Sequence, residues 1–278
     1  PHPDQIEQVA DLLVAAKVPI LVGGRGAAQN GAAKPIEELA DLLGAMLATT
    51  LPARGLFDHS SHSLHVCGGF AHPEAVPVFD ASEVVVAFGA SLSTHTLTHG
   101  KLRKNATVVQ VDPEASGLRH GLKNADIYMR ADAKLTAEAL IEAVKRRGNP
   151  AANIRSKDLS RRLREVPDDT THYQIDDGRI DPRTLFEQLQ DIIPKDYDVV
   201  CGSGHQNYFH VPMRGYDGTK YHIMREFGAI GNSLSYTLGI AAARKHGRIV
   251  LFEGDGSLMM HIQELETAQR HGLKFLVV

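Results

Sequence analysis

The sequence has no tryptophan, only two cysteines in 278 residues and no excess of basic residues. Its formal net charge of −3 argues against a basic nucleic-acid surface and against binding to anionic membranes. No stretch approaches the roughly 18 consecutive apolar residues that a membrane-spanning helix needs. Cys67 and Cys201 lie far apart in apolar or glycine-rich surroundings. They therefore indicate buried free thiols in a reducing cytoplasm rather than a disulfide framework.

Both ends of the sequence suggest a piece of a longer polypeptide. The chain begins at Pro1 rather than at a methionine, no signal peptide precedes it, and it ends on an apolar strand. Its length suits one large or two ordinary domains, and its hydrophobic fraction of 43% can supply a sizeable core. We therefore expect a segment of a longer protein that contains more than one folded unit.

Apolar strands alternate with helices in the first half of the chain. Helices are expected at 6–16, 35–47 and 131–146, and strands at 18–22, 48–50, 83–88 and 107–111. The longer strands are apolar on both faces, which indicates a parallel sheet covered by helices on both sides. Residues 1–148 are therefore predicted to form a doubly wound α/β domain with the look of a dinucleotide fold.

The character of the chain changes at 149–179 and the alternation then restarts. The polar run PDDTTHYQIDDGR and a charged helix near 157–165 indicate an exposed interdomain linker. Further helices are expected at 181–193 and 258–270, a glycine-rich turn followed by an apolar helix is expected within 228–245, and strands are expected at 198–201, 248–252 and 274–278. Residues 180–278 are thus predicted to be a second doubly wound parallel-sheet unit, truncated at its C-terminus.

An acidic glycine turn follows the strand at 248–252. In open α/β sheets, ligands bind beyond the carboxyl ends of the strands, where Gly254, Asp255 and Gly256 are expected. Glycines let the backbone approach an anion, and the amides of Gly256 and Ser257 favour phosphate. Asp255 has the wrong sign for direct contact with phosphate, but a divalent cation can bridge the two. The turn therefore predicts a Mg²⁺–diphosphate site, although the tripeptide alone is more typical of a simple tight turn.

The surrounding residues carry a family resemblance. The stretch EGDGSLMMHIQELETAQRHGLKFLVV closely resembles the cofactor-binding segment of thiamine diphosphate-dependent enzymes, the superfamily of acetolactate synthase, benzoylformate decarboxylase and pyruvate decarboxylase. In that family an asparagine pair follows the turn and supplies a second metal ligand. Here the chain ends a few residues short of the position of that pair. The resemblance implies thiamine diphosphate and Mg²⁺ as cofactors, with Asp255 as a metal ligand.

Two other segments of the second unit resemble the same family. REFGAIGNSLSYTLGIAAA is similar to the turn whose first glycine accepts the cofactor's amino group and whose bulky apolar residue wedges beneath the thiazolium. The resemblance assigns these roles to Gly228 and Ile230, although Ile230 is equally suited to fill a core. CGSGHQNYF is similar to the loop that contacts the diphosphate, which implies His205, with Gly204 in place of the usual glutamine.

The first unit resembles the central domain of the superfamily through PILVGGRGA, ARGLF, HVCGGF, VVVAFGASLS and ATVVQVD. The glycine pattern at Gly24 and Gly26 lacks the third glycine of a Rossmann fingerprint, so no NAD site is predicted. Acetolactate synthases can hold FAD here, with an arginine after the FG turn. This chain has Ser91 and Leu92 in that neighbourhood, so the charge-assisted contact is lost and FAD is not expected.

Five histidines raise the question of a zinc site: His59, His62, His65, His95 and His99. Spacing of three residues can place two side chains on one helical face. The stretch is rich in serine, resembles a loop and has no obvious carboxylate or cysteine partners, which disfavours zinc.

The resemblance implies chemistry at the C–C bond of a 2-oxo acid, with the cofactor as electron sink. Acetolactate synthase-like carboligation is the first expectation; a benzoylformate-type decarboxylase and a non-catalytic paralogue are the alternatives. An NAD- or FAD-binding deacylase-like domain is a further alternative, against which the missing glycine counts. In the family, the activating glutamate lies in an N-terminal domain of the partner subunit. No catalytic residue is therefore expected in this segment, which should be inactive alone, and the site is expected between subunits of a homodimer or homotetramer.

Overall fold

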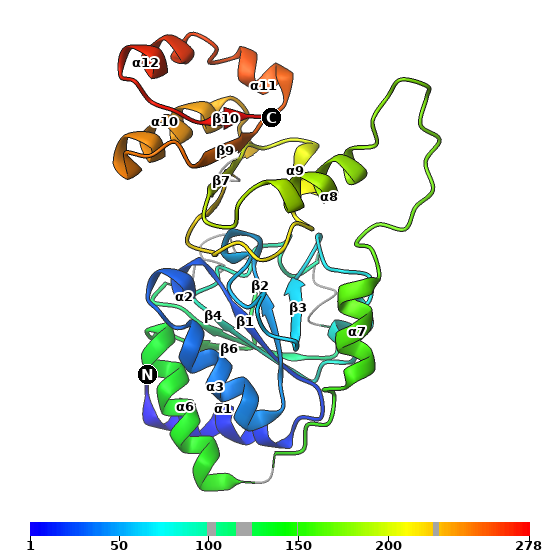
Figure 1. Ribbon diagram of the computed structural model, residues 1–278. Helices are drawn as coiled ribbons and strands as arrows, with labels where there is room; N and C mark the ends of the chain where they lie inside the picture. Colours follow the sequence, from blue (N-terminus) through cyan, green and yellow to red (C-terminus); the bar gives the residue numbers. More distant parts are fainter. Residues whose placement is uncertain (99–103, 115–123, 149, 225–227) are drawn as a thin grey trace. The chain divides into compact units, whose positions relative to one another are not determined.

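The computed structural model describes the chain except residues 99–103, 115–123, 149 and 225–227 (Figure 1). The chain forms two compact units, Pro1–Thr170 and Thr171–Val278. Each unit contains one sheet in which every described strand pair is parallel, so the predicted α/β fold class is confirmed. Within the described part of the chain, no helix combines the length and the apolarity that crossing a bilayer requires.

The first unit is built on a sheet with the strand order β3-β2-β1-β4-β5-β6 among the described residues. Its strands are β1 (Pro19–Gly23), β2 (Met46–Thr49), β3 (Ser63–Val66), β4 (Val84–Phe88), β5 (Thr107–Val111) and β6 (Ile127–Met129). The order reverses between β1 and β4, which is the point where ligands bind in open α/β sheets.

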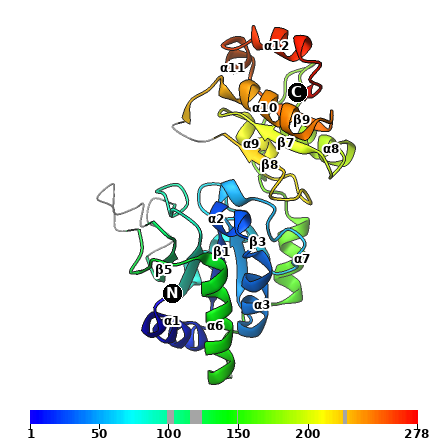
Figure 2. The same ribbon diagram turned by 90° about the vertical axis from the view of Figure 1, so that its left-hand side faces the viewer.

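Helices cover both faces of this sheet because neighbouring strand residues point to opposite sides. Leu21 of β1 packs into one core, whereas Ile20 and Val22 pack into the other. The first face carries α1 (Pro3–Ala15), α3 (Ala33–Leu43) and α6 (Ala133–Arg147), with α6 in contact with both others (Figure 2). The second face carries α4 (Val76–Ala81) and α7 (Lys157–Glu165), while α2 (Arg25–Gln29) and the 3-10 helix η1 (Leu51–Ala53) follow β1 and β2.

Some boundaries in the first unit differ from the sequence prediction. The helix expected at 35–47 ends at Leu43, because Gly44 adopts a left-handed conformation (φ +70°) that terminates it. Met46 and Leu47 therefore begin β2 instead of extending the helix. The strands β3 and β6 were not predicted, since their short and partly polar segments lack a continuous apolar run.

The stretch 149–179 is not uniformly exposed. Leu159 and Leu163 of α7 are 5% exposed and belong to the second core of the first unit. The helix therefore packs against the sheet instead of lying free in a linker, because its few apolar residues fall on one face. The domain boundaries at 148 and 180 stay a prediction. The division of the chain into two compact units falls between Thr170 and Thr171.

The second unit is a smaller sheet with the described order β10-β9-β7-β8. Its strands are β7 (Asp198–Cys201), β8 (Tyr221–Ile223), β9 (Ile249–Phe252) and β10 (Leu276–Val277); its helices are α8 (Pro182–Ile192), α9 (Gln206–His210), α10 (Asn232–Arg244), α11 (Asp255–Met259) and α12 (Glu264–Arg270). Leu234 and Ala241 of α10 pack on one face of the sheet. On the other face, the rings of Phe186 and Phe252 lie 4.8 Å apart.

The helix expected at 258–270 is interrupted. The amides of Met260 and His261 donate to the carbonyls three residues earlier, at Ser257 and Leu258, so the α-helical pattern is lost between α11 and α12. The strand β8 was not predicted, and the final strand is shorter than the expected 274–278.

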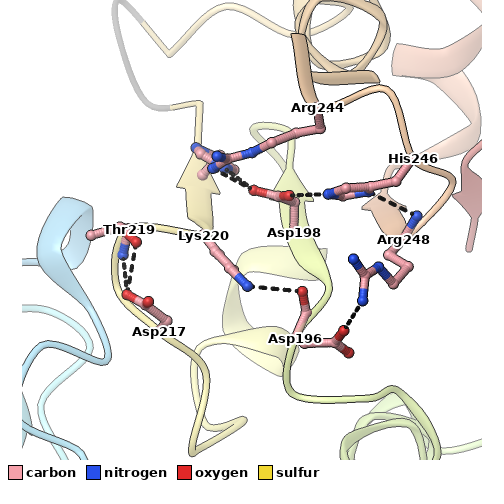
Figure 3. A network of polar contacts seen from close by, with 9 residues as sticks. Asp196, Asp198, Asp217, Thr219, Lys220, Arg244, His246 and Arg248 are labelled. Carbon is pink, nitrogen blue, oxygen red and sulfur yellow. Dashed lines mark hydrogen bonds and ion pairs between the residues drawn. The ribbon is translucent and has the colours of Figure 1, made fainter. Parts of the chain in front are cut away.

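A polar cluster holds the amino ends of the strands together. The buried carboxylate of Asp198, the first residue of β7, lies 3.0 Å from His222 Nε2 and 3.2 Å from Arg244. Figure 3 shows Arg244 and His246 turned toward Asp198 from α10 and the loop that follows it. Three basic side chains therefore surround one buried carboxylate, at the sheet edge opposite the acidic glycine turn.

Candidate cofactor site

Three loops of the second unit meet at the carboxyl ends of β7 and β9. These strands pair in parallel up to Cys201 and Phe252, so the loops that follow them start side by side (Figure 1). The amide of Gly202 donates to the carbonyl of Phe252 at 3.2 Å. The third loop precedes α10 and is joined to α11 by a buried hydrogen bond from the Gly231 amide to the Ser257 hydroxyl, at 2.7 Å.

The acidic turn after β9 leads directly into α11, with Gly254 as its N-cap. Asp255 is exposed, and its Oδ1 accepts a hydrogen bond from the Gly256 amide at 2.8 Å. The sequence predicts a free amide at Gly256, whereas in the structure this amide is hydrogen-bonded to Asp255. An anion at this turn has to compete with the side chain of Asp255 for that donor, unless a cation draws the carboxylate away.

The glycines of this edge leave open space. Among the described residues, a Cβ added at Gly256 or Gly228 would meet no atom within 4 Å, and one at Gly254 would meet only Gln206 Oε1 at 3.9 Å. Gly228 also has a positive φ of +68°. A ligand can therefore approach the backbone at all three positions, which fits the binding of a bulky anion.

Ile230 lies in the loop before α10, next to Gly231. Its side chain is 46% exposed, so within this chain it does not fill a core. Gly231 has a φ of +92°, and a Cβ there would lie 2.9 Å from His261 Nδ1. The residue after Ile230 therefore lies against the turn that follows α11, and the wedge role of Ile230 stays a prediction.

The loop after β7 is held by a residue that sequence reasoning missed. The amide nitrogen of buried Asn207 donates to the carbonyls of Gly202 and Gly204, both at 3.1 Å, and its oxygen pairs with His210 Nε2 at 2.9 Å. Gln206 Nε2 also donates to Gly202 O at 3.1 Å. His205 is exposed, beside the ring of Tyr208, and among the described residues no contact joins it to Asp255.

Glu253, directly before the acidic turn, was also missed. Burial raises the pKa of its carboxyl, while the Ser257 hydroxyl and the Gly254 amide favour the charged form and offset part of the rise. Its Oε2 is buried without a hydrogen-bond partner, and the same is true of Ser233 Oγ and His261 Nδ1. Among the described residues, three buried polar atoms beneath these loops are thus unsatisfied, a pattern common at functional sites.

The residues present fit a diphosphate bound through Mg²⁺, although they do not complete a metal site. Asp255 supplies an exposed carboxylate oxygen, which is a preferred ligand of Mg²⁺, and the open glycines leave room for phosphate. Within the described residues, no group of three or more His, Cys, Asp or Glu side chains could hold a metal. Mg²⁺ usually keeps several waters and takes substrate phosphates as ligands, so one carboxylate can suffice from this chain.

In the first unit, the carboxyl ends of the strands are closed at the switch point, the place between β1 and β4 where the strand order reverses. The amides of Gly24 and Gly26 donate to the carbonyls of Phe88 and Gly89 at 2.8 and 3.0 Å. A Cβ at Gly24 would lie 2.2 Å from Gly89 O, and one at Gly26 would lie 2.9 Å from Gly89 Cα. These glycines therefore allow two turns to pack together, and their amides are not available to a pyrophosphate.

The segment after β4 closes this edge further. The carbonyl of His95 accepts from the Gly69 amide at 3.2 Å, and a Cβ at Gly68 would lie 2.2 Å from the same oxygen. Leu92 and Leu97 of this segment are buried. Gly68 and Gly69 follow β3, so the segment passes the ends of β1 and β2 to reach them. The described residues on this edge, which exclude 99–103 and 115–123, do not fit a flavin dinucleotide across the switch point.

Three of the candidate histidines, His59, His62 and His65, have different surroundings. His59 pairs with Glu37 at 2.5 Å, and His65 lies 3.5 Å from Asp58. Burial lowers the pKa of His62, and nearby Arg155 lowers it further. His95 lies in the segment after β4, and His99 lies outside the described residues.

Comparison with known proteins links both units to one group of enzymes. Residues 6–140 match the family model described as thiamine pyrophosphate enzyme, central domain. Residues 202–278 match the model described as thiamine pyrophosphate enzyme, C-terminal TPP binding domain. The second match contains the three loops, from Gly202 to the acidic turn and beyond.

Two curated relatives match the whole chain at low sequence identity. An acetolactate synthase of Mycobacterium avium is 27% identical over 285 residues, which cover 100% of this chain and 45% of that protein. The acetolactate synthase isozyme 3 large subunit of Escherichia coli (strain K12) is 27% identical over 285 residues, which cover 100% of this chain and 49% of that protein. The chain thus spans about half the length of the curated relatives it matches.

Proposed function

Because this chain belongs to the thiamine pyrophosphate enzymes, we propose that it is part of a Mg²⁺-dependent, acetolactate synthase-like enzyme that joins 2-oxo acids. The observation that carries the proposal is the exposed Asp255 in an open glycine turn at the end of β9, inside the segment matched by the TPP-binding model. The names of the curated relatives support carboligation over decarboxylation.

In this proposal each loop has its own task. Asp255 holds Mg²⁺, and the open backbone at Gly254 and Gly256, together with the amide of Ser257, lies against the diphosphate. Once bound, thiamine diphosphate supplies an electron sink for the carbon that loses or gains a C–C bond.

The other two loops orient the cofactor. Gly228 would offer its carbonyl to the cofactor's amino group, and the exposed side chain of Ile230 would act as the wedge that orients the cofactor. His205 contacts the diphosphate from the loop after β7. All three assignments extend the family resemblance to this chain, residue by residue.

The group that activates the cofactor lies outside this chain in our proposal. The described residues of the second unit offer the diphosphate end of the site, and the family places the activating glutamate on the partner subunit. We therefore propose a homodimer or homotetramer in the cytoplasm, with the active site between subunits. A chain limited to these 278 residues is expected to bind the cofactor weakly and to catalyse nothing.

We further propose that the first unit holds no flavin. The closed switch point at Gly24 and Gly26 and the segment that carries His95 support this view. The full-length protein, incubated with FAD and desalted, should show no flavin absorption. Stoichiometric flavin in the visible spectrum would refute it.

The central proposal is tested by calorimetric titration of the full-length protein with thiamine diphosphate. Binding should require Mg²⁺, and Asp255→Ala should weaken it by more than the roughly 10–100-fold that loss of an outer-shell partner costs. Glu266→Ala is the control, since Glu266 is an exposed carboxylate on α12 that pairs with Arg270. Unchanged metal-dependent affinity in Asp255→Ala would show that the metal site is assigned to the wrong residue.

A further inference from the structure

Resting on the proposed cofactor site, we propose that Glu253 is a positioning residue that fixes the three loops of the site relative to one another. It is the last residue before the acidic turn, and its carboxyl group lies beside Gly202 of the loop after β7, with Oε2 buried. Asp255, two residues later, remains exposed and accessible to a metal ion.

The first contact joins Glu253 to the loop after β7. A Cβ added at Gly202 would lie 2.4 Å from Glu253 Oε1, so the carboxyl group occupies the position that a side chain at Gly202 would need. This loop leads to Gln206 and carries His205. The carboxyl group therefore sets how closely the diphosphate loop approaches the acidic turn.

Ser233, at the start of α10, lies near the same point. The same hypothetical Cβ at Gly202 would lie 2.7 Å from Ser233 Oγ, so the hydroxyl and the carboxyl group of Glu253 are neighbours. Both Ser233 Oγ and Glu253 Oε2 are buried without a hydrogen-bond partner. A proton or a water molecule shared between them would satisfy both groups.

The second connection passes through Ser257. Its buried hydroxyl accepts from the Gly231 amide at 2.7 Å and lies close enough to Glu253 to stabilise the carboxylate. Gly231 directly follows Ile230, and Ser257 lies two residues after Asp255. The Ser257 hydroxyl thus joins the loop before α10, which carries Ile230, to the acidic turn after β9. Because the side chain of Ser257 is used in this contact, only its backbone amide is left for the phosphate.

These contacts distinguish a positioning role from metal ligation. Glu253 Oε1 also accepts from the Gly254 amide at 3.2 Å, so the carboxyl group is held by protein on several sides. A neutral side chain of the same shape can keep these contacts, because Oε1 remains an acceptor and the new NH₂ group can donate to Ser233. A metal ligand would instead need the negative charge.

The test measures the dissociation constant of thiamine diphosphate at saturating Mg²⁺ for the full-length protein and its variants. Glu253→Ala should weaken binding at least 10-fold, in the range of outer-shell losses around metals, whereas Glu253→Gln should bind close to wild type. Ser257→Ala should also weaken binding, because it removes the bond to Gly231 but keeps the amide. Glu266→Ala serves as the unaffected control.

The outcomes separate the alternatives. Wild-type affinity in Glu253→Ala would overturn the inference, and an equal loss in Glu253→Gln would overturn it in favour of a charged metal ligand. If Glu253→Ala does not fold, Ser257→Ala and Glu253→Gln decide instead, since wild-type affinity in Ser257→Ala would overturn the inference. Failure of the wild-type protein to bind would refute the proposed function itself, and the inference with it.

Discussion

Gly202 offers the sharpest test of how tightly the loops of the second unit pack. A methyl group there would lie 2.4 Å from Glu253 Oε1 and 2.7 Å from Ser233 Oγ, both below any normal contact distance. Both atoms are the ends of side chains, so the Glu253 carboxyl group and the Ser233 hydroxyl have to shift away from the new methyl group. Overpacking of this kind costs about 1–3 kcal/mol of unfolding free energy.

A matched substitution in the same unit should have the opposite effect. Gly239 lies inside α10 and is exposed, and a methyl group added there would meet no atom within 4 Å. Replacing a glycine inside a helix by alanine gains roughly 0.5–1 kcal/mol. The two Gly→Ala changes are chemically identical, so the difference between them isolates the space beside Glu253.

The assay is thermal unfolding of the full-length protein without cofactor, followed by circular dichroism. Gly202→Ala should lower the transition of this unit by about 4 °C or more per kcal/mol, and Gly239→Ala should raise it slightly. Gly202→Ala should also weaken binding of thiamine diphosphate, because the carboxyl group of Glu253 is displaced. A melting temperature for Gly202→Ala equal to or above wild type would refute the packing described for these loops.

Three further predictions concern the first unit. Gly68→Ala should destabilise it by about 1–3 kcal/mol in urea unfolding, because Gly68 has a φ of +91° and the new methyl group would lie 2.2 Å from His95 O. Gly69→Ala should be near neutral, because a methyl group there would meet no described atom within 4 Å. Equal effects of the two substitutions would contradict the close approach of these segments. Burial raises the pKa of the Cys67 thiol to about 12, so its peptide should be alkylated only after unfolding, and rapid labelling of the native protein would contradict its burial. Burial also raises the pKa of Asp112, so the folded state binds this proton more tightly than the unfolded state, and stability is lost as pH rises from the ordinary value through the raised one. Asp112→Asn should therefore gain stability relative to wild type across that interval, and a constant difference in urea midpoints would count against the shift.

The alternation of apolar strands with amphipathic helices was enough to predict the two α/β units. It works because strands buried on both faces read as continuous apolar runs, as in 84–88 and 249–252. Short strands such as Ser63–Val66 and Tyr221–Ile223 carry no such run and depend on pairing with neighbours that are distant in sequence. The helix 157–165 was expected to be exposed because most of its residues are charged, yet two leucines suffice to pack it.

Some residues of the candidate site could likewise be predicted from the sequence, and others could not. Glycines and Asp255 after β9 follow from the position of ligands at the carboxyl ends of parallel strands, so the turn could be named from sequence. Glu253 and Asn207 could not, because their importance lies in contacts across loops that no spacing along the chain reveals. The glycine turn after β1, at Gly24, and the one after β9, at Gly256, also look alike in sequence. Only the structure distinguishes open glycines at Gly256 from packed ones at Gly24.

The most direct measurement of the central claim is a crystal structure of the complete protein with thiamine diphosphate, in which Mn²⁺ replaces Mg²⁺ and is located by its anomalous signal. We predict a single metal peak at Asp255, about 2.0–2.2 Å from its carboxylate oxygen, with the diphosphate against the turn at Gly254 and Gly256. A metal peak elsewhere, or a cofactor bound away from the end of β9, would contradict it.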